Sequence, residues 1–179
     1  MALLGGLAAA AFFATATLCS SRSARMLPPS SVLAWVMVTG LLALLPALAL
    51  VDVPSVDAGE VGWLLVSGGG NVAGLLLAYS ALRRGKVGVV APVLSTEGAI
   101  AAVAAVASGE RLAVAAAWLL PLIAVGVALA ASGPTTDVPT APGPTGPGTR
   151  PVLLAGIAAG CFGASLYATS RASADLPVA

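Results

Sequence analysis

Long runs of apolar residues, separated by short polar segments, make up most of this 179-residue chain. Each run has about the 20 residues that a helix needs to cross a hydrocarbon core of roughly 30 Å. The pattern therefore predicts an all-α membrane protein, a polytopic bundle of about six transmembrane helices. The first run could also be a signal peptide, but no basic segment precedes it. The six predicted spans are 2–20, 31–51, 61–82, 87–107, 113–131 and 151–170.

Composition supports this class and excludes several functions. The chain is 59% hydrophobic and only 8% charged, whereas soluble domains average about 25% charged residues. A net charge of +1 gives no basic surface for nucleic acid. The chain has no histidine, which excludes histidine metal sites and Ser-His-Asp triads. We therefore expect no enzyme, no metal site and no cofactor. Cys19 and Cys161 are expected to be free packing residues.

An internal repeat is predicted on either side of a linker. Residues 132–150 hold five Pro, four Gly and five Thr, a composition typical of an extended, flexible linker. A shift of 150 residues places the last apolar run over the first, so that Phe162 lies over Phe12 and Gly156 over Gly6. Five spans separate the two copies, so the second is inverted, as in many secondary transporters. We therefore divide the chain into a five-helix repeat (1–131), the linker (132–150) and the first helix of an incomplete second repeat (151–179). This favours a truncated product of a longer protein.

The basic residues are unevenly distributed between the two sets of loops. The loops after the first, third and fifth spans hold most of them, and the positive-inside rule then places the N-terminus outside. These residues are Arg22, Arg25, Arg83, Arg84, Lys86 and Arg150, against Arg111 and Arg171 on the other side.

Glu97 is the residue most suggestive of chemistry. It lies near the middle of span 87–107, where a lone carboxylate costs about 2.5–3.5 kcal/mol. Pro92 can kink this helix and free a carbonyl, and Ser95 and Thr96 add hydroxyls beside the acid. Three readings stay open: a proton-coupling or cation-binding carboxylate, a structural acid bonded to a neighbouring helix, or a half-helix end bent toward the surface.

Asn71 is the second candidate, at a similar depth in span 61–82. Helical spacing puts Ser67, Asn71, Gly74 and Ala78 on one face, and a short turn joins this span to the next. We therefore expect a contact between Asn71 and Glu97. Helix packing is the alternative role for Asn71, and the GxxxG patterns at Gly70 and Gly156 are also read as helix contacts.

Two further predictions concern the ends of the spans. Tyr79 closes span 61–82 and could line a substrate cavity, although interface anchoring or packing is the stronger reading. Glu110 and Arg111 follow span 87–107 and are expected to form a surface ion pair.

The segment 79–112 resembles the repeat signature of the EamA-like branch of the drug/metabolite transporter superfamily. The resemblance rests on Tyr79 with Ala81-Leu82, on Ala91-Pro92, and on Gly109-Glu110 with Leu112. It implies a ten-helix protein of two inverted repeats that moves metabolites, amino acids or drugs, often outward. It also implies a cytoplasmic N-terminus, against the charge count. Glu97-Gly98 departs from the family pattern, so no family role transfers to Glu97.

These observations favour a secondary transporter that exports small molecules by alternating access and that can couple this export to protons. The Ala, Gly, Val and Arg bias favours the inner membrane of a bacterium. Two alternatives stay open: a non-transporting membrane scaffold or assembly protein, and a half-size carrier that acts as a homodimer. The expected partners are the lipid bilayer and a small-molecule substrate.

Overall fold

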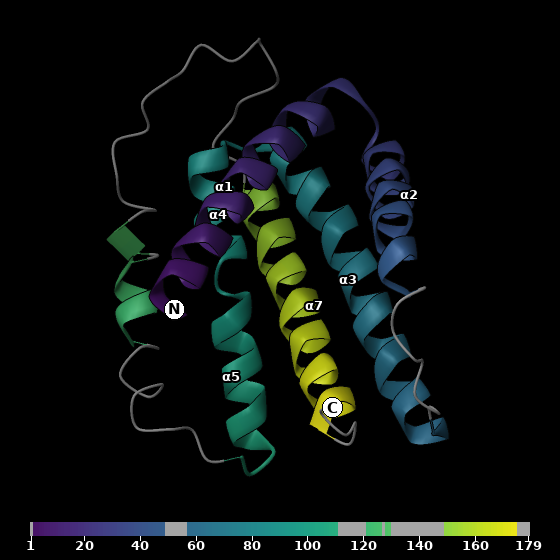
Figure 1. Cartoon of the computed structure of the whole chain (residues 1–179). Helices are drawn as coiled ribbons and strands as arrows, with labels where there is room; N and C mark the ends of the chain where they lie inside the picture. The colour runs from purple at the N-terminus through teal and green to yellow at the C-terminus, as the bar shows by residue number, and fades with distance from the viewer. Residues whose placement is uncertain (1, 49–56, 111–120, 127, 130–148, 175–179) are drawn as a thin grey trace.

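The computed structural model describes residues 2–48, 57–110, 121–126, 128–129 and 149–174, and this part of the chain holds helices and no strand. The all-α, polytopic fold class is therefore confirmed. The helices are α1 (Ala2–Met26), α2 (Pro29–Leu48), α3 (Ala58–Arg84), α4 (Val87–Leu94), α5 (Glu97–Ala107) and α7 (Thr149–Ala174), arranged as a bundle (Figure 1).

Four segments of the described chain are long and apolar enough to cross a membrane: Pro29–Pro46, Ala58–Arg84, Val87–Ala107 and Thr149–Ser173. They correspond to the second, third, fourth and sixth predicted spans. The first predicted span forms α1, a helix of 25 residues, although it is not one of these four. Most of the predicted span 113–131 and of the linker 132–150 lies outside the described residues.

The fourth span is two helices, because the backbone ladder is interrupted between α4 and α5. The Thr96 N–H donates to the Val93 carbonyl, only three residues back, at 3.2 Å. The regular four-residue spacing resumes when the Ile100 N–H donates to the Thr96 carbonyl at 3.0 Å. Pro92 lies inside α4, so the interruption follows the proline rather than falling on it.

Helix α7 lies between α3 and α5 (Figure 1). The contact with α3 is so close that a Cβ on Gly70 would be 2.9 Å from the Cys161 carbonyl oxygen, and one on Gly74 would be 2.8 Å from the Phe162 ring. On the α5 side, a Cβ on Gly163 would be 2.7 Å from the Ile100 side chain. Small residues thus let α7 approach both neighbours, as membrane helices require.

Three helix termini meet beside Gly85, at what we call the Gly85 end of the bundle. Arg25, near the end of α1, donates from its guanidinium to the Gly85 carbonyl at 3.2 Å. Pro151, at the start of α7, lies 2.7 Å from where a Cβ on Gly85 would be. Helices α1 and α3 therefore run toward this end and α7 runs away from it. An inverted repeat requires this antiparallel geometry, and the repeat itself stays a prediction.

The buried core belongs to the same end. It gathers residues of α1, α2, α3, α4 and α7, and much of it is alanine: Ala24, Val32, Leu33, Ala78, Tyr79, Ala81, Leu82, Val90, Leu94, Ala155 and Ala158. By contrast, α2 exposes large apolar side chains such as Trp35 and Leu42, which are 67% and 59% exposed. An apolar outer surface suits a helix that faces lipid.

Candidate functional site

Glu97 is the first residue of α5, directly after the interruption in the fourth span. The side chain is partly buried. Its carboxylate forms no hydrogen bond or ion pair with any other residue that the structure describes. Glu97 sits midway along the candidate span Val87–Ala107, the position in a membrane-spanning helix where a carboxylate is most expensive.

Ser95 and Thr96 form the turn that leads into Glu97. The Ser95 hydroxyl donates to the Ala91 carbonyl at 3.0 Å, and the Thr96 hydroxyl donates to the Val93 carbonyl at 2.7 Å. Such bonds back to the preceding turn can bend helices, although the same bond at Thr15, Thr39 and Ser80 leaves α1, α2 and α3 uninterrupted. Each hydroxyl oxygen keeps lone pairs that can accept a hydrogen bond from a ligand.

The expected contact between Asn71 and Glu97 is not formed. No hydrogen bond joins the two side chains in the described structure, and Asn71 is exposed on α3. The reason is that α7 lies between α3 and α5 (Figure 1). The backbone of Glu97 instead faces α7, where a Cβ on Gly163 would be 3.0 Å from the Glu97 carbonyl oxygen.

Ser67 and Tyr79 serve the packing of α3. The Ser67 hydroxyl lies 2.7 Å from the Thr169 hydroxyl, and its carbonyl accepts a hydrogen bond from Ser165 at 2.8 Å. Tyr79 is only 4% exposed and belongs to the core of the Gly85 end. Of the predicted residues, the structure therefore groups Ser95, Thr96 and Glu97, and it leaves Asn71, Ser67 and Tyr79 apart from them.

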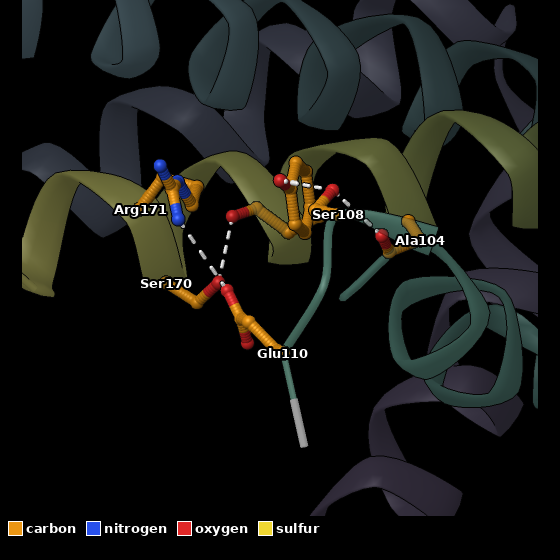
Figure 2. A network of polar contacts seen from close by, with 6 residues as sticks. Ala104, Ser108, Glu110, Ser170 and Arg171 are labelled. Carbon is orange, nitrogen blue, oxygen red and sulfur yellow. Dashed lines mark hydrogen bonds and ion pairs between the residues drawn. The ribbon is translucent and has the colours of Figure 1, made fainter. Parts of the chain in front are cut away.

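A polar cluster at the opposite end of the bundle was not predicted from the sequence (Figure 2). The Tyr167 hydroxyl of α7 donates to the Ser108 hydroxyl at 2.6 Å, and Glu110 forms an ion pair with Arg171 of α7 at 3.6 Å. Trp63 of α3 packs edge-on against Tyr167, with ring centroids 6.1 Å apart. We call this the Glu110 end. Glu110 pairs here with Arg171, and the predicted partner Arg111 lies outside the described residues.

The remaining site chemistry is limited. No group of three or more potential metal ligands occurs in the described part of the chain. Cys19 and Cys161 are both free thiols. The arrangement can therefore offer one carboxylate and two hydroxyls at mid-depth, with small residues of α7 beside them.

Comparison with known proteins identifies the family. The family model described as the EamA-like transporter family matches residues 1–132 of the 179. No curated protein and no solved structure matches the chain. The match covers most of the chain and agrees with the apolar helices of the bundle. The protein belongs to the EamA-like transporter family, and it is an integral membrane transporter of the drug/metabolite transporter type.

Proposed function

We propose that this protein is a secondary transporter that exports a small metabolite, amino acid or drug by alternating access, with Glu97 as the group that exchanges a proton for substrate. One observation carries the proposal: Glu97 stands at a helix interruption midway through a span, without a partner in the described structure. Interrupted helices at this depth commonly form transporter binding sites, because their backbone can face a cavity.

Ser95 and Thr96 are the proposed substrate contacts beside Glu97, and Asn71, which α7 separates from them, is a proposed contact on the α3 side. The two hydroxyls adjoin Glu97, and the exposed Asn71 amide can both donate and accept hydrogen bonds. Ser67 and Tyr79 have a weaker claim, because their positions are explained by helix packing. A substrate that carries an amine or another cationic group would complement the carboxylate.

The test uses proteoliposomes that contain the full chain and a trapped pH-sensitive dye. A panel of amino acids and cationic drugs is added on one side, and substrate-driven proton movement is recorded. The Glu97→Gln variant should abolish proton movement, because the amide cannot exchange a proton. The Glu60→Gln variant is the matched control, since Glu60 lies in the first turn of α3 and only caps that helix. Unchanged proton movement in Glu97→Gln would remove Glu97 from the mechanism.

The domain division and the location belong to this proposal. Residues 1–131 would form one five-helix repeat, 132–150 a linker, and 151–179 the first helix of a second repeat, within a bacterial inner membrane. A half-size carrier that acts as a homodimer is the second candidate, because the family match, residues 1–132, coincides with the proposed five-helix repeat. Cross-linking of the full chain in native membranes separates the two, since a homodimer should give a cross-linked species of twice the mass.

A further inference from the structure

The two halves of the fourth span, α4 and α5, differ in how deeply they are buried. At the Gly85 end, α4 takes part in the apolar core: Val90 is fully buried and Leu94 is 7% exposed. Helix α5, by contrast, has no buried residue. The two halves of one span thus differ, because α4 is fixed in the core, whereas α5 packs closely on α7 near its start, where a Cβ on Gly163 would be 2.7 Å from the Ile100 side chain.

In the described part of the chain, two polar contacts at exposed positions join the far end of α5 to α7. They consist of the Ser108–Tyr167 hydrogen bond at 2.6 Å and the Glu110–Arg171 ion pair at 3.6 Å (Figure 2). Both charged side chains are 45% exposed, and an ion pair this accessible contributes little to stability. Such contacts can break and re-form at little energetic cost, unlike an apolar core.

A glycine turn directs Glu110 toward α7. Gly109 has φ +88°, and its N–H donates to the Val106 carbonyl at 2.9 Å, while the Glu110 N–H donates to the Ala105 carbonyl at 3.1 Å. These two bonds form a Schellman motif, which requires a left-handed residue after the helix. The turn ends α5 and brings the Glu110 carboxylate back to Arg171.

The connection between the two halves is suited to bending. The interruption at Ser95–Thr96 replaces the regular backbone ladder with a three-residue bond. A span with a fixed half, an interruption and a weakly held half has the construction of a hinged arm.

From this construction we infer that α5 is the moving arm of the transporter, hinged at Ser95–Thr96 and latched to α7 by Ser108–Tyr167 and Glu110–Arg171. This rests on the proposed function, in which Glu97 is accessible to water from one side of the membrane and then from the other. Release of the latch swings the far end of α5 from α7 while α4 stays in the core. It opens a path to Glu97 from the Glu110 end, and re-formation of the latch closes it.

The test measures two distances in the full chain by double electron–electron resonance, after Cys19 and Cys161 are replaced by serine. Spin labels at Val72 of α3 and Val106 of α5 report on the arm, since both side chains are substantially exposed. Labels at Val72 and Gly88 report on α4, where a Cβ on Gly88 meets open space.

The latch variant combines Glu110→Gln with Tyr167→Phe. We expect it to raise the population of a longer Val72–Val106 distance by about fivefold or more and to leave Val72–Gly88 unchanged. Glu60→Gln, which removes a carboxylate at the same end outside the latch, should change neither distance.

No change in the Val72–Val106 distance, or an equal change in both pairs, would overturn the hinged arm. The readout is independent of transport. A positive result with normal proton movement in Glu97→Gln would therefore refute the proposed role of Glu97 alone.

Discussion

At the residue scale, glycines decide how closely the helices approach. Gly70 and Gly74 of α3 face α7 with no room for a Cβ, whereas Gly68 and Gly69 face open space. The sequence alone shows a run of three glycines and a GxxxG pattern, and both features suggest a helix contact. Only the packing of α7 distinguishes the glycines that the close α3–α7 contact requires from those that it does not.

Gly70→Ala should destabilise the protein. The added methyl would lie 2.9 Å from the Cys161 carbonyl oxygen, and such overpacking costs about 1–3 kcal/mol. Gly69→Ala, one residue earlier, meets nothing and should be neutral or more stable by up to about 1 kcal/mol. Thermal unfolding of the two variants in detergent gives the comparison. Equal melting temperatures would contradict the close α3–α7 contact.

Gly109→Ala should also lower stability, for a different reason. The residue has φ +88°, a conformation that costs an L-residue roughly 1–2 kcal/mol. The expected drop in melting temperature is about 2–4 °C per kcal/mol for a chain of this size. Gly98→Ala within α5 is the control, because its Cβ meets open space. A variant as stable as the wild type would mean that α5 does not need the Schellman turn.

At the element scale, α7 is the helix on which α3, α4 and α5 pack, while α1 and α2 pack on α3. It buries one face of small residues against α3, α4 and α5, and it exposes Leu153 and Ile157 on another. Its apolar run is similar in composition to the others, so its place between α3 and α5 cannot be derived from hydropathy. The inserted α7 is also why the Asn71–Glu97 contact expected for neighbouring hairpin helices is absent.

Ala168→Leu should disturb this arrangement. Ala168 is fully buried, and a larger side chain there forces its neighbours apart at a cost of about 1–3 kcal/mol. Ala164→Leu adds the same volume on an exposed position of the same helix and should change little. The measurement is the fraction of each variant that stays monodisperse after heating in detergent, which should be lower for Ala168→Leu than for Ala164→Leu. If Ala164→Leu proved the more harmful, the assigned face of α7 would be wrong.

At the scale of the whole molecule, the two ends differ in charge as well as in packing. Arg25 and Gly85 lie together at one end with the start of α7, and Glu110 and Arg171 lie at the other. The grouping of basic residues at the Gly85 end agrees with the loops that the charge count assigned to one side. Which side faces the cytoplasm stays a prediction.

Cysteine labelling with a membrane-impermeant maleimide tests this orientation, after the two native cysteines are replaced by serine. Met26→Cys lies near the Gly85 end and is 83% exposed in the parent chain. Ala58→Cys and Ser173→Cys lie toward the Glu110 end, at the start of α3 and the end of α7. We expect Ala58→Cys and Ser173→Cys to label from one side of sealed vesicles and Met26→Cys from the other. Labelling of Met26→Cys and Ser173→Cys from the same side would disprove the antiparallel arrangement of α1 and α7.

Much of the candidate site could be predicted from the sequence, but its surroundings could not. A lone acid within an apolar run, with hydroxyls and a proline beside it, singled out Glu97 without any coordinates. The sequence contains only an indirect indication of the latch, because Gly109-Glu110 predicts a turn followed by a charge. Nothing in it identified the partners Tyr167, Ser108 and Arg171. Side-chain partners from segments 59 and more residues apart depend on how helices pack, and apolar periodicity does not encode that.

By itself, the sequence determined the membrane class, four of the membrane-spanning segments and the family, because these depend on local properties: run length, hydropathy and short motifs. The tertiary structure decided that α7 lies between α3 and α5, where the fourth span is interrupted, and which polar groups meet. The physical reason is that an apolar helix face is about as stable against lipid tails as against another helix. Close contact between small residues therefore determines which helices become neighbours. Those contacts exist only once the helices are assembled.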